Sequence, residues 1–443
     1  MQLTLAIRGH ASRLTRSAFV RNVMVVMTGT AAAQAIGFAL SPVISRLYTP
    51  SDFGVFGSFM AVSGVIAAGA TLEYPQAIML PRSHEDAINL FAVSCLTTAV
   101  SGIVCLLCCV LAPGTAGELM KTGAFWVLLL LVLATIVNGV NQSCQAWCVR
   151  VKAFRQTSTS QVVRSLSANG TQMGVGYLGA GAPGLIVASV LGDTLASLNL
   201  VRVVLSDLKA LRKSIGWARM RELAREYRDF PQYSATMNVM NALSLGLPVL
   251  LLTHFYGIAV AGAYAFGIRI VSTPMGFVTR SLRQVLFQKA CEIHNEGDRL
   301  LPLFLKLTSG MFLVALLPAL ALVAWGPQIF TWVFGGQWQT AGVFVRSLTL
   351  WLLFMFCNLP AVLFGRIMRI QRKMFAYDVS ILLGRTLVLV LGGSYLSAST
   401  TVLLFSVFGA IMNVVVIVVV GRTLQAKEVD LDWSQIPTAM AVK

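Results

Sequence analysis

The sequence predicts an all-α polytopic membrane protein with about 12 transmembrane helices, arranged as two six-helix lobes. The chain is 56% hydrophobic and only 12% charged, about half the charged fraction of a typical soluble domain. It therefore cannot cover itself with a polar surface. It also repeats apolar runs of about 20 residues, the length needed to cross about 30 Å of hydrocarbon. Together these two observations place the chain in a lipid bilayer.

The predicted spans fall into two groups of six. We place them at residues 23–45, 53–72, 88–111, 124–145, 159–178, 183–205, 232–253, 258–279, 302–325, 341–363, 375–396 and 400–421. The stretch between the groups is rich in both charges and contains Trp217 and Tyr227. We expect it to form an amphipathic cytoplasmic connector.

Landmarks of the first half return in the same order roughly two hundred residues later. The matching pairs are Pro42 and Pro248, Tyr48 and Phe255-Tyr256, Gly54 and Gly262, His84 and His294, and Arg164 and Arg385. An internal repeat follows, with lobes at residues 1–205 and 231–443 and a linker at 206–230. Because six spans is an even number, both copies enter the membrane from the same side. This predicts a pseudo-two-fold axis along the membrane normal.

The positive charge of the chain, +17 at pH 7, follows the predicted topology. With the N-terminus inside, the outer connecting segments contain only two basic residues, Arg46 and Lys121. All other basic residues of the connecting segments lie inside. The positive-inside rule then predicts that both termini are cytoplasmic. The charge is explained by topology, so no nucleic-acid partner is expected.

Several predicted spans carry polar side chains along one helical face. Gln34 lies on such a face of the first span, and Asn241 lies on the opening span of the second repeat. The fourth span carries Asn138, Asn141 and Gln145. Amide groups both donate and accept hydrogen bonds, so they suit sugar hydroxyls, and they equally suit hydrogen bonds between helices.

Arginines are the most informative residues of the predicted membrane region. Arg269, Arg280 and Arg283 share one face of the eighth span and its cytoplasmic extension. Burying a charge at the depth of Arg269 costs at least about 2.5–3.5 kcal/mol, which an anion or water must offset. The alternative for Arg280 and Arg283 is that they reach the lipid headgroups.

Three more arginines, Arg164, Arg346 and Arg385, also lie within predicted spans, where acidic residues are few. We therefore expect a cationic site for an anion, and the guanidinium fork matches phosphate. Asp193 is the clearest acidic residue at membrane depth. It is either the site of a coupling proton or the counter-ion of Arg164, and the second role is favoured.

The sequence lacks the usual signatures of catalysis. It has no G-x-x-x-x-G-K-[ST] motif, its four histidines are scattered, and the predicted outer loop Gly326–Thr340 contains no ionisable residue. Its eight cysteines are expected to be packing thiols without a metal. We predict no catalytic residue, no metal site, no cofactor and no enzymatic activity.

Two motifs carry a resemblance to a known family. The segment R-L-Y-x-P-x-D-F-G-x-F (Arg46 to Phe56) and the late F-G-x-x-W (Phe334 to Trp338) resemble those of Wzx-type polysaccharide-repeat-unit flippases. These flippases belong to the multidrug/oligosaccharidyl-lipid/polysaccharide exporter superfamily. One departure is Glu73, an acid where the family pattern has a base.

The resemblance implies a transporter of the bacterial inner membrane. It would move undecaprenyl-pyrophosphate-linked oligosaccharide from the cytoplasmic to the periplasmic leaflet by alternating access, for surface polysaccharide synthesis. A polymerase and a chain-length regulator of the same pathway are the implied partners. Two alternatives remain open: a cation-coupled multidrug exporter of the same superfamily, and a membrane enzyme of glycan assembly.

Overall fold

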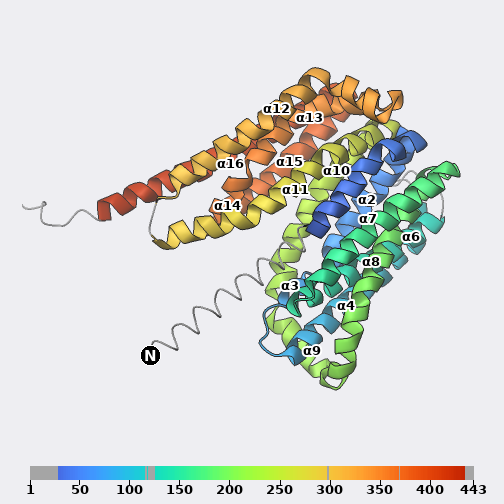
Figure 1. Cartoon of the computed structure of the whole chain (residues 1–443), viewed down its shortest axis with the longest axis vertical. Helices are drawn as coiled ribbons and strands as arrows, with labels where there is room; N and C mark the ends of the chain where they lie inside the picture. Colours follow the sequence, from blue (N-terminus) through green and yellow to red (C-terminus); the bar gives the residue numbers. More distant parts are fainter. Residues whose placement is uncertain (1–27, 115–116, 118–124, 297–298, 369, 435–443) are drawn as a thin grey trace, which may run out of the picture. The chain divides into compact units, whose positions relative to one another are not determined.

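Residues 28–114, 117, 125–296, 299–368 and 370–434 are described by a computed structural model. These residues form helices and turns and no strand, which confirms the all-α class. They divide into two compact units, Met1–Thr253 and His254–Lys443. Each unit is a bundle of long helices (Figure 1).

The first unit begins with a helix over residues 28–47. The helices that follow are α2 (Pro50–Ala70), α3 (Tyr74–Ala77), α4 (His84–Leu111), α6 (Phe125–Arg150), α7 (Phe154–Tyr177), α8 (Gly181–Leu211), a 3-10 turn (Arg212–Ser214), α9 (Trp217–Glu226), a π-helical turn (Phe230–Ala235) and α10 (Thr236–Tyr256). The second unit contains α11 (Ile258–Glu296), α12 (Leu301–Phe334), a 3-10 turn (Gly336–Trp338), α13 (Gln339–Cys357), α14 (Leu359–Ile367), α15 (Gln371–Tyr395) and α16 (Ala398–Ser434).

Ten helical segments of the described residues are long and apolar enough to cross a membrane. Each matches one of the predicted spans, and the chain is a multi-pass membrane protein. The other two predicted spans, 23–45 and 159–178, are helical where they are described, as the helix over 28–47 and as α7. Neither is among the ten. For α7 the reason is its composition, because Arg164 and many serine, threonine and amide side chains lie along it.

The prediction of an outer loop over Gly326–Thr340 is wrong. Helix α12 continues to Phe334, and α13 begins at Gln339 after one 3-10 turn. The helix ends at Gly335, whose φ of 110° is a conformation that only glycine adopts readily. Trp338 is fully buried beyond this turn and stacks on Phe266, with ring centroids 3.9 Å apart.

The predicted connector 206–230 is largely helical. Leu223 of α9 is buried against a cluster that contains Trp147, while Arg219 pairs with Asp86 at 2.7 Å. The hydrogen bond to the Asp86 carboxylate raises the pKa of Arg219 above its ordinary value. Asn89 of α4 also accepts a hydrogen bond from the Gly216 N–H at 3.0 Å. The connector is thus fastened to the start of α4.

Most of helix α10 belongs to the first unit, because it contacts helices of that unit. Ser58 and Thr253 share a buried hydrogen bond of 3.3 Å, and a Cβ on Gly246 would lie 3.2 Å from Ala61. The repeat pattern assigns this helix to the second lobe instead. The lobe boundaries at 205 and 231 therefore stay a prediction, and so does the symmetry axis.

The motif from Arg46 to Phe56 forms a structural corner. Thr49 and Asp52 make a capping box at the start of α2, and Asp52 also accepts a hydrogen bond from the Ala182 N–H at 2.8 Å. The buried Tyr48 hydroxyl donates to the Gln172 carbonyl at 2.6 Å. The most specific part of the sequence pattern therefore ties the start of α2 to the end of α7 and the start of α8.

Candidate functional site

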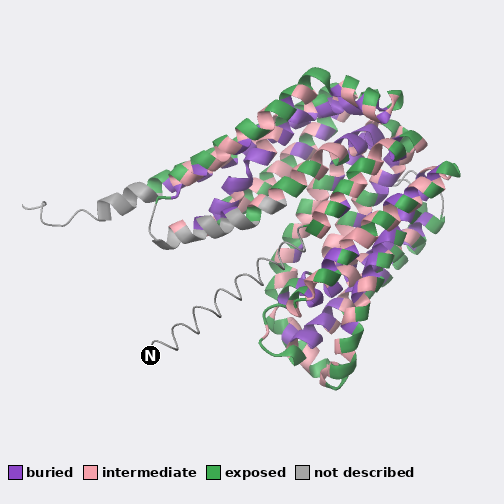
Figure 2. Ribbon diagram, viewed as in Figure 1, coloured by how far each residue is buried: buried purple, intermediate pink, exposed green. Residues whose placement is uncertain are grey.

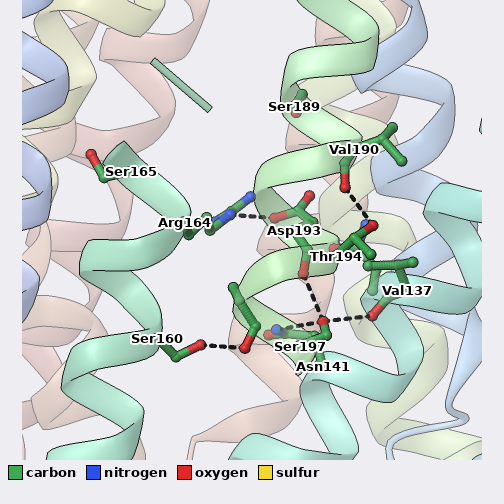
Figure 3. A network of polar contacts seen from close by, with 12 residues as sticks. Val137, Asn141, Ser160, Arg164, Ser165, Ser189, Val190, Asp193, Thr194 and Ser197 are labelled. Carbon is green, nitrogen blue, oxygen red and sulfur yellow. Dashed lines mark hydrogen bonds and ion pairs between the residues drawn. The ribbon is translucent and has the colours of Figure 1, made fainter. Parts of the chain in front are cut away.

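A polar network joins α6, α7 and α8 within the first unit (Figure 3). Its centre is an ion pair between the Arg164 Nε and an Asp193 carboxylate oxygen. The Asp193 side chain is 11% exposed, whereas that of Arg164 is 47% exposed. The carboxylate therefore lies inside the helical bundle, and the guanidinium extends from the bundle toward the surface of the unit.

Serine side chains extend this network below the ion pair. Ser197 donates to the Asp193 carbonyl at 2.7 Å, and Ser160 of α7 donates to the Ala196 carbonyl at 2.7 Å. In Figure 3 Ser160 and Arg164 lie one turn apart on α7, both directed at α8. These bonds fix the packing of the two helices at the depth of the charge pair.

The predicted amides of α6 enter the same network. Asn141 donates to the Ser197 hydroxyl at 2.9 Å, and Gln145 donates to the Asn141 side-chain oxygen. Asn138 donates to the Ala134 carbonyl of its own helix at 2.9 Å. In this arrangement Asn141 bonds between helices, the second of the two alternatives that its sequence position allowed. All three residues are half-buried, and their contact with a sugar stays a prediction.

The first helix joins α7 on another side. Ser165 donates to the Ala33 carbonyl at 2.6 Å, and Asn169 donates to the Ser165 carbonyl at 2.7 Å. Gln34 is half-buried beside Ala33, and Asn241 of α10 is exposed. The role of Gln34 and Asn241 with a substrate is not settled by these positions and stays a prediction.

Three predicted arginines lie on the single helix α11. Arg269 and Arg283 are exposed, and the side chain of Arg280 lies outside the described residues. Thr273 bonds to the Arg269 carbonyl at 2.7 Å, so this side chain turns back onto its own helix. The continuous helix confirms that the three positions share one helical element, which extends beyond the predicted span to Glu296.

Arg346 and Arg385 of the second unit have contrasting surroundings. Arg346 is exposed and donates to the Ala324 carbonyl at 3.0 Å. Arg385 is only 7% exposed, and its guanidinium carbon lies 4.4 Å from the centroid of the Trp351 ring and 5.1 Å from that of Phe405. A large substrate reaches Arg346 more easily than Arg385.

Sequence reasoning missed the partners of these arginines. Trp351 and Phe405 surround Arg385 from α13 and α16, and no local pattern marks them, because each is one aromatic residue among many in apolar spans. Ser197 and Ser160 do lie on the polar faces of their helices. Both residues could have been found from the sequence, because each is a polar residue one helical turn from Asp193 or Arg164.

Glu73, the departure from the family pattern, occupies an unusual backbone position. Its φ is +60° and that of Leu72 is +49°, a left-handed conformation that costs non-glycine residues about 1 kcal/mol or more. The carboxylate is buried and accepts hydrogen bonds from Gln76 and from Asn238 of α10. Glu73 thus joins the end of α2 to α10.

The solved structures that resemble this chain share one transporter fold. An inward-facing multidrug resistance MATE family transporter of the MOP superfamily matches with a TM-score of 0.69 and 14% identity, over 90% of this chain and 95% of that one. The lipid II flippase MurJ in an inward closed conformation also gives 0.69, with 12% identity, over 89% of this chain and 86% of the other. At such identities the likeness shows the two-lobed all-helical fold.

The family is shown by sequence. The polysaccharide biosynthesis protein model matches residues 43–343, a range that holds both motifs, and the chain belongs to this family. The resemblance that the motifs indicate is confirmed. No curated protein sequence matches the chain.

Proposed function

We propose that this protein is a flippase for a lipid-linked oligosaccharide whose lipid bears a pyrophosphate, of the undecaprenyl class. It would carry repeat units of a surface polysaccharide from the cytoplasmic to the periplasmic leaflet of the inner membrane. Family membership and the fold shared with a lipid II flippase support this proposal. The observation that carries it is the polar exposed face of α7.

Helix α7 differs from α4, another helix of the first unit, in the residues that it exposes; Figure 2 marks the exposed positions of the chain in green. The exposed positions of α4 include Leu96, Val100, Ile103, Val104 and Leu107, which suit lipid. The exposed positions of α7 are mostly polar or glycine, and include Gln156, Thr159, Arg164, Gly170 and Gly174, while Leu166 and Tyr177 are its exposed large apolar residues. A polar helix face at membrane depth is stable only against protein or water. We infer that this face borders a water-filled path.

Exposed arginines occur in each unit and suit a pyrophosphate. Arg164 extends from α7 with almost half of its side chain exposed, and α11 of the second unit exposes Arg269 and Arg283. A diphosphate cannot cross hydrocarbon without compensating charge, and guanidinium groups bind it through paired hydrogen bonds. We assign Arg164 of the first unit, and Arg269 and Arg283 of the second unit, to binding of the pyrophosphate, and we leave the buried Arg385 out of this role.

Alternating access would let one path serve both leaflets. The lipid tail would remain in the bilayer while the headgroup moves along the polar face. Both termini would be cytoplasmic, and the product would feed a polymerase and a chain-length regulator on the outer side. Reporter fusions after Lys443 and within residues 206–230 should then read cytoplasmic. A periplasmic reading at either place contradicts this orientation.

A second candidate is a cation-coupled multidrug exporter, which the fold shared with a MATE transporter favours. Such a protein would bind cationic drugs through a buried carboxylate. Asp193 is the buried acid of the network, and Arg164 already neutralises it. This pairing makes Asp193 a weak site for a drug cation. The other buried carboxylate described above, Glu73, is engaged by Gln76 and Asn238, and both observations favour the flippase.

Complementation of a strain that lacks its own repeat-unit flippase tests the proposal. Arg269→Ala should abolish surface polysaccharide while the protein remains in the membrane at normal level. Arg269→Lys should also lose most export if paired hydrogen bonds matter, because lysine offers a point charge without a fork. Wild-type export by the alanine variant would remove Arg269 from the residues proposed to bind the pyrophosphate. Drug resistance without polysaccharide export by the wild-type protein would favour the second candidate.

A further inference from the structure

Arg385 lies in the core of the second unit without a carboxylate partner among the described residues. The residue is buried, with only 7% of its surface exposed. Two aromatic rings, Trp351 and Phe405, lie against the guanidinium. Cation–π contact recovers part of the lost hydration of a buried cation, but it leaves the N–H donors unsatisfied.

Two buried donors at this place have no hydrogen-bond partner among the residues that the structure describes. They are Arg385 Nε and Trp351 Nε1. Both groups only donate, so the group that satisfies them must accept hydrogen bonds. Trp351 is 4% exposed and lies on α13, across from α15. Two helices thus present donors around one buried positive charge.

In the first unit the charge of the corresponding arginine is neutralised by a side chain of the protein. Arg164, the counterpart of Arg385 in the repeat, pairs with Asp193 from the next helix, α8. In the second unit the next helix, α16, offers Phe405 and Gly409 to the arginine. A Cβ on Gly409 would lie 3.2 Å from Arg385 Nη2, so the position of α16 next to the guanidinium carries no side chain. Ser406 of α16 accepts a hydrogen bond from the Trp351 backbone N–H at 3.2 Å.

We propose that Arg385 and the Trp351 indole N–H bind a small inorganic anion of the halide class inside the second unit. The anion supplies the negative charge that Asp193 supplies in the first unit. A group with 7% exposure does not admit a pyrophosphate with its lipid and sugar, whereas two buried N–H donors beside a positive charge suit a monatomic anion. The site is distinct from the proposed path for substrate, and it does not depend on which substrate is moved.

Thermal unfolding of the purified full-length protein in detergent tests the proposal. The midpoint is compared in sodium chloride and in sodium gluconate at matched ionic strength. Chloride severalfold above its Kd should raise the wild-type midpoint by roughly 1–2 °C. Arg385→Met should lose this difference. Trp351→Phe keeps an aromatic ring and removes the indole N–H, so it should reduce the chloride effect on the midpoint. This variant tests the proposal if Arg385→Met does not fold.

Arg422→Met is the matched control, because Arg422 is an exposed cation of the same unit and should keep the chloride effect. Crystals grown in bromide should show anomalous scattering beside Arg385 and Trp351. An equal midpoint of the wild-type protein in both salts would overturn the proposal and leave water as the occupant. A chloride effect that survives in both Arg385→Met and Trp351→Phe would overturn it as well.

Discussion

Arg164 and Arg385 hold corresponding places in the two copies of the predicted repeat, yet their surroundings differ. Arg164 is half exposed and pairs with a buried aspartate, while Arg385 is buried between aromatic rings. The repeat therefore preserves the helical position of an arginine and not its chemical environment. We infer that the two copies have separate tasks: the first presents charge to the substrate path, and the second keeps a charge in its core.

The largest contrast is expected when each arginine is replaced by methionine. Arg164→Met leaves the buried Asp193 carboxylate unpaired, and removing one partner of a buried pair costs about 3–5 kcal/mol. Because Arg164 is partly exposed, the expected loss in the free energy of unfolding is about 3 kcal/mol. Arg385→Met, in buffer without chloride, removes an uncompensated charge and should change the free energy of unfolding by less than about 1 kcal/mol.

Denaturant titration in mixed micelles measures both values. The double variant Arg164→Met/Asp193→Asn is the control, because it removes both charges and should recover part of the loss. A larger loss for Arg385→Met than for Arg164→Met would reverse the comparison.

The packing around Arg385 predicts a smaller effect at Gly409. A Cβ there would lie 2.7 Å from Trp351 Cδ1, so Gly409→Ala must displace the ring and should destabilise the protein by about 1–3 kcal/mol. Gly310→Ala in α12 of the same unit is the matched control, because nothing lies within 4 Å of its Cβ. That substitution should be neutral or stabilising. Equal unfolding midpoints for the two variants would show that the site is not closely packed.

Two tyrosines test where the copies remain alike. The Tyr48 hydroxyl donates to the Gln172 carbonyl near the end of α7, and the Tyr256 hydroxyl lies 2.8 Å from the Gly392 carbonyl near the end of α15. Tyr48→Phe and Tyr256→Phe should each cost about 1 kcal/mol. Thermal unfolding of the two variants gives the comparison. A loss confined to one of them would limit the structural equivalence of the copies.

The sequence allows most of the fold to be predicted, because apolar runs and their spacing are local properties. Ten spans and the helical nature of α7 follow from such runs. The pairing of Arg164 with Asp193 was also predictable, since both are charges in neighbouring spans and the membrane forces them together. By contrast, the helical segment between Gly326 and Thr340 was mistaken for a loop, because its one proline and three glycines also favour a loop.

The aromatic surroundings of Arg385 were beyond sequence reasoning. Trp351 and Phe405 come from helices separated from Arg385 in the chain, and their contact depends on how three helices pack. No spacing within one helix reports that packing. For the same reason, the sequence did not distinguish the buried Arg385 from the half-exposed Arg164.

Cysteine accessibility tests the central claim, that the exposed face of α7 meets water, most directly. Gly170→Cys and Gly174→Cys place thiols on this face at positions where a Cβ meets nothing within 4 Å. Val100→Cys and Val104→Cys place them on the exposed apolar face of α4. In intact membranes a small charged thiosulfonate should label the two α7 variants well above the parent protein and leave the two α4 variants at its level. Equal labelling of the two helices, or labelling of α4 alone, would contradict a water-filled path along α7.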